Sequence, residues 1–329
     1  MSVEPFGRFC APVLAVSGFS GSGKTTLLEA AIPELVRGGI SVAVVKHDAH
    51  GIQIDRSGKD SDRVFQAGAT VALRGPDQQF LRRQATSLLS LHATLEFLSH
   101  DHDLLLVEGH KNTPLPKFWL RDATQSEIPG DVTNVVGILE WNTNRVREFV
   151  SFVRGWLPVA WRQRPVVRGL LLDNGPRDFP GKSLMAPESG ELAQDGSIDT
   201  VVFGSGPLPP RYQNLSLIPN PPGIAAPLGA LLAAHRWAPA AAWIISDRES
   251  QLSALYIDWL VSLRAPGRWA VIPRGRDSSC PVGGLFEPQA LTVLERDAVG
   301  EPDGKVRIDR LIEHPRTLRV EAPATIERR

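Results

Sequence analysis

A glycine-rich segment near the start of the chain carries residue types that bind phosphate. Gly18, Gly21, Gly23, Lys24 and Thr25 match the pattern G-x-x-x-x-G-K-[ST] at every fixed position. Glycines let backbone N–H groups approach the phosphates, the lysine places charge on the β- and γ-phosphates, and the threonine hydroxyl can ligate Mg²⁺. The spacing therefore predicts a P-loop for a nucleoside triphosphate. Its predicted contacts are Gly18, Ser20, Gly21, Ser22, Gly23, Lys24, Thr25 and Thr26.

Acidic residues follow two later apolar runs that read as strands. Glu108 directly follows the run at 104–107, and open α/β sheets bind their ligands at the carboxyl ends of their strands. We expect Glu108 to support Mg²⁺ or the attacking water. Asp55 and Asp60 follow the run at 42–45, where a second Mg²⁺-linked or ribose contact is sterically possible. The predicted catalytic residues are Lys24 and Glu108, and the predicted metal ligands are Thr25, Asp55 and Glu108.

His47, Asp48 and His50 directly follow the strand at 42–45 and point to the same edge of the sheet. Two imidazoles and a carboxylate on one loop are more often polar loop residues than a transition-metal site. A contact with nucleotide or substrate phosphate is the preferred interpretation, with His47 in that role. The chain has no N-K-x-D run, so its residues do not decide between guanine and adenine.

The spacing of apolar residues predicts the elements that position these side chains. Apolar runs at 13–16, 42–45, 104–107 and 135–139 alternate with segments of helical periodicity, such as residues 27–35. Strands buried on both faces by helices give an α/β fold with a mostly parallel sheet. A helix near 146–153 would close this domain. A second series of strands follows, at 168–172, 200–203, 215–218, 242–245 and 269–272.

Composition limits the class of protein. The 329 residues carry 36 Lys plus Arg against 36 Asp plus Glu, and 42% are apolar. This length predicts two domains, which we place at 1–160 and 161–329. Balanced charge disfavours nucleic-acid and membrane-surface partners. The sequence also lacks a secretory signal and an unbroken membrane span, so we expect a cytoplasmic protein. Its two cysteines, Cys10 and Cys280, form no CxxC pair.

Several motifs, in order, resemble the molybdopterin-guanine dinucleotide biosynthesis protein B (MobB) family. Besides the P-loop at 16–27, these are V-V-K-H-D-A-H at 44–50, Asp55 with G-K-D-S at 58–61, Q-A-G-A at 66–69, L-V-E-G-H-K at 106–111 and P-L-P-K at 114–117. The resemblance covers residues 12–156. It implies a GTP-binding protein with weak GTPase activity, typically dimeric, that assists attachment of GMP to molybdopterin. The positions it implies outside the P-loop are Asp55, Lys59, Asp60, Glu108 and Lys111.

The second half resembles the companion guanylyltransferase (MobA), which implies a Rossmann-like nucleotidyltransferase domain. The signature L-A-G-G-x-S-x-R-M-G-x-D-K corresponds here to residues 171–182, where Asp173 and Asn174 replace the glycine pair. A carboxylate and an amide there should obstruct a triphosphate. Further matches are Arg177, Lys182, P-L-G-A-L-L at 227–232, Asp247 as a possible metal ligand, and P-V-G-G-L-F at 281–286.

Two functions follow from these resemblances. In the first, the chain is a GTP-binding adapter in molybdenum cofactor biosynthesis, and its degenerate second domain docks molybdopterin, a guanylyltransferase or a molybdoenzyme. In the second, the chain is bifunctional and also transfers GMP from GTP to molybdopterin, with Asp247 on Mg²⁺ and Arg177 or Lys182 on the phosphates. A small-molecule kinase is a third possibility, although no arginine-rich lid is evident.

Overall fold

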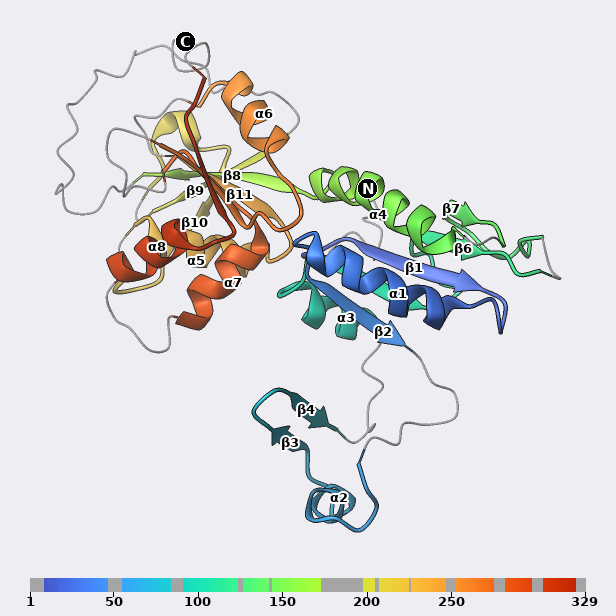
Figure 1. Ribbon diagram of the computed structural model, residues 1–329. Helices are drawn as coiled ribbons and strands as arrows, with labels where there is room; N and C mark the ends of the chain where they lie inside the picture. Colours follow the sequence, from blue (N-terminus) through green and yellow to red (C-terminus); the bar gives the residue numbers. More distant parts are fainter. Residues whose placement is uncertain are drawn as a thin grey trace.

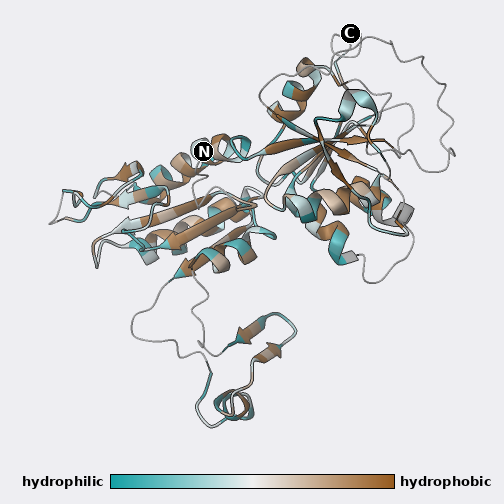
Figure 2. Cartoon of the chain, turned by 180° about the vertical axis from the view of Figure 1, so that it is seen from behind, coloured by the Kyte–Doolittle hydropathy of each residue, from teal (hydrophilic) through white to brown (hydrophobic). Residues whose placement is uncertain are grey.

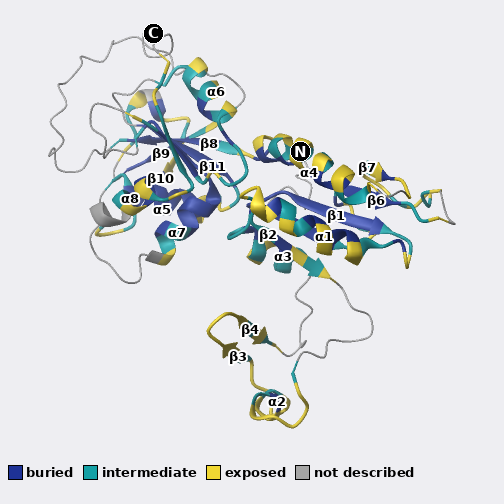
Figure 3. Ribbon diagram, in the orientation of Figure 1, coloured by how far each residue is buried: buried dark blue, intermediate teal, exposed yellow. Residues whose placement is uncertain are grey.

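The computed structural model describes residues 9–46, 55–83, 91–123, 127–141, 144–172, 198–204, 207–224, 226–246, 252–274, 282–297 and 304–323. Within these residues the chain forms two main sheets and a small hairpin unit (Figure 1). The strands of both main sheets are largely apolar (Figure 2), and they contain the most deeply buried residues (Figure 3).

The first sheet confirms the predicted parallel α/β fold. Its strand order is β2-β5-β1-β6-β7, and every neighbouring pair is parallel. Val16 lies opposite Glu108, so the carboxyl ends of the first and fifth strands meet at one edge. The strands are β1 (Val13–Gly18), β2 (Val42–Lys46), β5 (Leu104–Glu108), β6 (Lys117–Leu120) and β7 (Val135–Leu139).

Helices cover both faces of this sheet. On one face α1 (Lys24–Arg37) and α4 (Arg145–Arg162) pack against β1, β5 and β6, while α3 (Leu91–Ser99) packs on the other. Helix α1 buries Leu27, Leu28, Ala31 and Leu35, the stripe that helical periodicity predicted. No described helix is long and apolar enough to cross a membrane.

A small unit lies apart from this sheet (Figure 1). It consists of α2 (Asp60–Gln66), β3 (Val71–Arg74) and β4 (Gln79–Arg82). The strand β3 does not join the main parallel sheet. It pairs antiparallel with β4 instead, because the short connection at 75–78 can join only neighbouring antiparallel strands.

The second sheet has seven strands in the order β10-β9-β8-β11-β13-β12-β14. All neighbours are parallel except those of β13, which runs antiparallel to β11 and β12. The sequence predicted five of these strands and missed the last two along the chain. The strands are β8 (Val166–Leu171), β9 (Asp199–Phe203), β10 (Ser216–Ile218), β11 (Ala242–Ser246), β12 (Ala270–Pro273), β13 (Leu285–Phe286) and β14 (Thr317–Val320).

Helices again lie on both faces of the second sheet. Helices α5 (Leu228–Trp237), α7 (Pro288–Asp297) and α8 (Gly304–Glu313) bury the large apolar core against one face. On the other face lie α6 (Ala254–Ser262) and the short 3-10 turn η1 (Pro210–Tyr212). The second half is therefore also an α/β layer structure.

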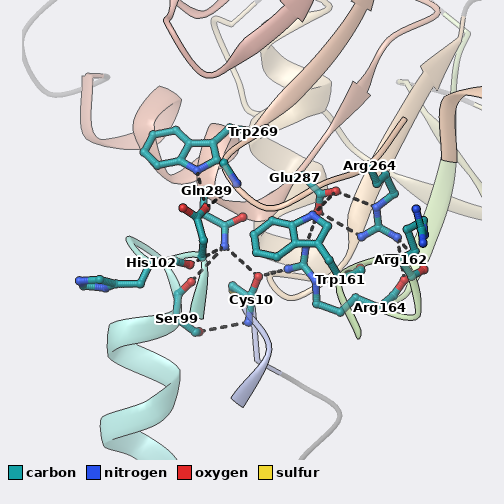
Figure 4. Close-up of polar contacts among 12 residues, drawn as sticks. Cys10, Ser99, His102, Trp161, Arg162, Arg164, Arg264, Trp269, Glu287 and Gln289 are labelled. Carbon is teal, nitrogen blue, oxygen red and sulfur yellow. Dashed lines mark hydrogen bonds and ion pairs between the residues drawn. The ribbon is translucent and has the colours of Figure 1, made fainter. Parts of the chain in front are cut away.

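Buried polar contacts join the two halves around Glu287 (Figure 4). Its carboxylate accepts hydrogen bonds from Arg164 (2.6 Å), Arg264 (2.7 and 3.1 Å) and Trp161 (3.1 Å). Gln289 donates to the carbonyl of Cys10 at 2.8 Å. Because these groups are almost fully buried, the two halves share one dehydrated polar interface.

The halves meet through the amino ends of their parallel strands. Asp103 precedes β5, and its carboxylate accepts hydrogen bonds from Arg316 at 2.7 Å and from the backbone N–H of Gly267 at 3.1 Å. Arg316 precedes β14, and Trp269, which also contacts Asp103, precedes β12. The carboxyl edges of the two sheets, where α/β proteins bind ligands, therefore face away from each other.

Cys10 belongs to this interface. Its thiol donates to the carbonyl of Pro239 at 3.2 Å, and burial raises its pKa to about 11. A thiol with so high a pKa is unreactive at neutral pH. Cys280 lies outside the described residues.

Candidate functional site

The glycine-rich loop joins β1 to α1 in the geometry that the sequence predicted. Gly21 and Gly23 have positive φ values of 80° and 82°, which L-residues rarely adopt. A Cβ on Gly18 would lie 2.6 Å from the carbonyl oxygen of Leu120, so a larger residue would push the loop away from β6. Glycine at these three positions therefore sets the loop's path.

Lys24 lies at the start of α1 and folds back over the loop. Its Nζ donates to the carbonyls of Phe19 at 2.7 Å and Gly18 at 3.2 Å. Partial burial lowers the pKa of Lys24, while the neighbouring carboxylate of Glu108 acts against that shift. The ammonium group thus stands within the loop that a phosphate would enter.

Thr25 and Glu108 come together across the carboxyl ends of β1 and β5. Thr25 Oγ1 donates to Glu108 Oε1 at 2.7 Å, and Lys46 Nζ lies 3.5 Å from both oxygens. The Glu108 side chain is only 11% exposed, so it is held at this point. The sequence had not singled out Lys46, although its position at the end of β2 puts it at the same edge.

The donors at this point fit Mg²⁺. The ion prefers oxygen ligands, and proteins usually hold it with one or two side chains plus substrate phosphates and water. Thr25 and Glu108 supply a hydroxyl and a carboxylate at adjoining positions. The described residues contain no cluster of three or more His, Cys, Asp or Glu suited to a metal, so a complete protein cage is not what this part of the chain offers.

Arg145 is a site residue that sequence reasoning missed. At the start of α4, it donates to the carbonyl of Ser22 at 2.8 Å, to that of Glu140 at 3.2 Å, and to that of Arg121 at 2.5 Å. Partial burial lowers its pKa. It ties the phosphate loop to the ends of β6 and β7. Its signal in the sequence was weak, because 123 positions separate Arg145 from Ser22.

The structure does not bring the other predicted acidic residues to the loop. Asp55 lies in the small unit, 3.5 Å from the guanidinium of Arg82, which also binds Asp62 at 2.8 Å. Lys59 and Asp60 are exposed in the same unit. Of the predicted metal set, only Thr25 and Glu108 are therefore neighbours here.

The remaining predicted site residues are exposed, buried beneath the loop, or outside the described residues. Ser20, Thr25 and Thr26 are exposed in the loop and the first turn of α1, whereas Ser22 is buried beneath it. Lys111 is exposed in the turn that follows β5. His47 lies outside the described residues, as do Asp173, Asn174, Arg177, Lys182 and Asp247.

The P-L-P-K segment at 114–117 has a structural role. Lys117 is fully buried, and its ammonium donates to the carbonyls of Leu115 and Thr133, both at 3.0 Å, and to that of Thr113. Desolvation lowers its pKa. The lysine thus fastens the connections on either side of β6, the strand next to the phosphate loop.

A parallel sheet whose first strand leads through a glycine-rich loop into a helix defines a P-loop protein of the α/β class. The family model for "Molybdopterin guanine dinucleotide synthesis protein B" (MobB) matches residues 13–140. The chain belongs to the MobB family through this N-terminal part. The matched residues end before the second sheet begins.

Two similar proteins are molybdopterin-guanine dinucleotide biosynthesis adapter proteins. The one from Haemophilus influenzae is 33% identical over 162 residues, which are 44% of this chain and 89% of that protein. The one from Escherichia coli is 35% identical over 169 residues, 46% of this chain and 96% of that protein. This chain therefore contains nearly the whole length of these relatives.

Solved MobB structures align with a similar share of the chain. The crystal structure of molybdopterin-guanine biosynthesis protein B covers 44% of this chain and 99% of its own, at 21% identity and a TM-score of 0.35. That of Bacillus subtilis MobB covers 41% and 82%, at 28% identity and a TM-score of 0.34.

Proposed function

We propose that this protein is a GTP-binding adapter in the biosynthesis of molybdopterin guanine dinucleotide. The observation that carries the proposal is the contact of Thr25 with Glu108 directly beside the Lys24 loop. The names of the MobB relatives supply the pathway and the adapter role. Guanine rather than adenine comes from the family resemblance, since the described residues contain no assigned base contact.

The nucleotide would bind with its phosphates on the loop at 18–25. Lys24 would turn from the loop carbonyls to the β- and γ-phosphates, and Thr25 with Glu108 would hold Mg²⁺. The metal ion neutralises phosphate charge when it is bound. Glu108 is already engaged by Thr25 and Lys46, and Arg145 by carbonyls, so neither is poised to activate water. We therefore expect hydrolysis to be slow.

We also propose two domains, at 1–160 and 161–329, with a MobA-like second domain. Support comes from the second sheet, whose strand order reverses between β8 and β11. Ligands of open α/β sheets bind beside the carboxyl ends of such a pair. In the sequence, Asp173 and Asn174 follow the first of these strands after one intervening residue, and Asp247 directly follows the second. The nucleotidyltransferase resemblance and the strand order thus both favour a ligand site beside the carboxyl ends of β8 and β11.

The orientation of the sheets favours the adapter over a chain that uses a single GTP at both sites. The phosphate loop follows β1, while the carboxyl ends of β8 and β11 lie at the far edge of the other half. Because these two edges face away from each other, a nucleotide on the loop could not also reach the carboxyl ends of β8 and β11 of the same chain. A bifunctional enzyme would therefore need a second GTP, which Asp173 and Asn174 should repel.

We propose a homodimer as well, assembled through the small unit. Val64, Leu73 and Leu81 are 52%, 39% and 49% exposed there, and Asp62 is its only buried residue among those described. A helix and a two-stranded hairpin this small do not form a stable core alone. A second copy of the chain is the proposed cover. Molybdopterin and a separate guanylyltransferase or molybdoenzyme are the other proposed partners, in the cytoplasm.

Reconstitution tests the function. The full chain would be added to molybdopterin, Mg²⁺-GTP and a purified guanylyltransferase, and the dinucleotide product would be measured. We expect the chain to raise product formation and Lys24→Ala to abolish the effect, while Arg147→Ala, an exposed neighbour on α4, should behave as wild type. No stimulation would contradict the adapter role. Product formed without the added transferase would establish the bifunctional alternative instead.

A second experiment addresses the C-terminal half directly. Replacing Asp173 and Asn174 with glycine restores the signature pair. In the adapter account, the double variant should gain transferase activity that the wild type lacks. Wild-type activity that is unchanged or reduced by the replacement would favour the bifunctional enzyme.

A further inference from the structure

Arg168 is a buried arginine that the proposed chemistry does not use. It lies on β8 with only 8% of its surface exposed. The two other buried arginines among the described residues, Arg164 and Arg264, both bind the carboxylate of Glu287. Within the described residues no carboxylate contacts Arg168. Its one polar contact there is a long one, from Nε to Ser246 Oγ at 3.5 Å.

The direction of that contact places the guanidinium toward the ligand edge of the second sheet. In the register of the two strands, Arg168 lies opposite Ile244 and Leu170 lies opposite Ser246. The side chain therefore leans toward the carboxyl end of its strand, to reach the last residue of β11. This is where the strand order reverses, between β8 and β11.

The apolar surroundings of Arg168 make burial of its positive charge unfavourable unless an anion lies beside it. On this face of the sheet, β8 lies between two apolar clusters, one beneath α6 and one around Tyr212. Desolvation lowers the pKa of Arg168, with Tyr212 acting in the opposite direction. Burying a cation without an anion is unfavourable, and an ionisable group perturbed by desolvation at a ligand-binding edge is a candidate for a functional site.

We propose that Arg168, with Ser246, forms the floor of a second anion site that binds a phosphate group of a nucleotide or a pterin. A guanidinium suits this ligand because it is always charged and offers paired N–H donors to phosphate oxygens. The inference rests on the proposal that residues 161–329 form a ligand-binding domain. It does not depend on GTP binding at the P-loop.

Calorimetry on the full chain in a Lys24→Ala background tests this site, because that change removes the first phosphate site. The probes are pyrophosphate, GTP and molybdopterin. We expect saturable binding of pyrophosphate and of one of the two larger ligands, weakened at least tenfold by adding Arg168→Met. The tighter of GTP and molybdopterin identifies the source of the phosphate. Arg236→Met, an exposed arginine of α5, serves as the matched control and should leave binding unchanged.

Thermal unfolding separates a ligand site from a structural ion pair. Removing an unpaired buried charge should raise the melting temperature, so Arg168→Met should be more stable than wild type. A lower melting temperature would mean that Arg168 neutralises a carboxylate of the chain, and would overturn the proposal. So would the absence of binding in the Lys24→Ala background, or equal binding with and without Arg168. With Lys24 intact, Arg168→Met should still bind GTP at the P-loop, so the two proposals fail separately.

Discussion

Arg145 connects backbone segments that are far apart in sequence and adjacent at the phosphate loop. It donates to the carbonyls of Ser22, Arg121 and Glu140, so it joins the loop to the ends of two strands. Its guanidinium also lies 4.7 Å from the centre of the Trp141 ring. Hydrogen bonds from a charged donor each contribute about 1.5 to 3 kcal/mol. The loop's conformation therefore depends on a side chain that does not belong to it.

Replacing this residue should weaken nucleotide binding without removing any proposed phosphate contact. We expect Arg145→Ala to raise the Kd for Mg²⁺-GTP about tenfold, which corresponds to about 1.4 kcal/mol. Arg147→Ala is the matched control, since Arg147 is an exposed arginine two residues further along α4. Calorimetry measures both. Equal affinities for the two variants would show that Arg145 does not hold the loop in its binding conformation.

His235 makes stability depend on pH. It is buried, its ring lies 5.8 Å from that of His100, and Glu295 and Arg236 lie near it at the protein surface. Burial lowers the pKa of His235 from 6.5 to about 4, and it also lowers the pKa of His100. The unfolded chain therefore binds a proton at a higher pH than the folded chain. Stability from this residue is present above about pH 6.5 and is lost as the pH falls toward about 4.

Denaturant unfolding at neutral pH and at about pH 5 measures this effect. The His235 contribution should fall by about 2 kcal/mol between the two conditions. In His235→Gln, the loss of stability over this range should be smaller than in wild type by that amount. Between about pH 7 and about pH 8 the two proteins should show no such difference. Parallel losses down to about pH 5 would mean that His235 is protonated in the folded state.

Among the structural elements, the small unit formed by α2, β3 and β4 shows most clearly which features depend on packing and not on the local sequence pattern. Arg82 binds Asp62 at 2.8 Å and lies 3.7 Å above the ring of Phe65, so it ties β4 to α2. Val64, Leu73 and Leu81 are nevertheless exposed, and Figure 3 colours most of the unit as exposed. The unit is therefore the element most in need of a partner surface.

A charge on this surface should prevent the proposed dimer. We expect Leu81→Glu to shift the full chain from dimer to monomer in sedimentation velocity, because a carboxylate would have to be dehydrated at the interface. Gln213→Glu adds the same charge at an exposed position outside the small unit and should leave the dimer intact. A wild-type chain that is monomeric, or a Leu81→Glu chain that stays dimeric, would exclude this unit as the interface.

Sequence patterns predicted the elements with strong local signals and missed those defined by long-range contacts. The P-loop and the strand that ends at Glu108 could be predicted because glycines, a lysine and a buried apolar run lie close together in the chain. Strand β6 was missed because Lys117 is a charged residue that the fold buries among carbonyls. Asp55 was placed at the metal because residues following a strand usually share its edge, whereas the structure places Asp55 beside Arg82 of the small unit.

At the scale of the whole molecule, Glu287 couples the two halves. Burial works against its charge, but Arg264 and Arg164 hold the pKa of Glu287 below its ordinary value. The carboxylate precedes α7 in the second half, while Trp161 lies in the last turn of α4 and packs in the core of the first sheet, and Arg164 follows that helix, so the network lies where the chain passes from one sheet to the other (Figure 4). Two halves that share such a buried ion network should unfold in one transition.

Removing the carboxylate should be strongly destabilising. We expect Glu287→Gln to cost about 3 to 5 kcal/mol of the free energy of unfolding, because two buried arginines lose their only acidic partner among the described residues. Glu295→Gln on α7 is the control, since its ion pair with Arg236 is exposed and should contribute below about 1 kcal/mol. Denaturant unfolding gives both values. A cost below that of the control would mean that the network does not hold the halves together.

The central claim is that the first half binds GTP on the loop that contains Lys24. Titration calorimetry of the full chain with GTP, ATP and GDP in the presence of Mg²⁺ tests it most directly, alongside Lys24→Ala and Arg147→Ala. The account predicts one high-affinity, GTP-selective site per chain in wild type and in Arg147→Ala, and the loss of that site in Lys24→Ala. Undetectable GTP binding by wild type, or binding that survives unchanged in Lys24→Ala, would contradict it.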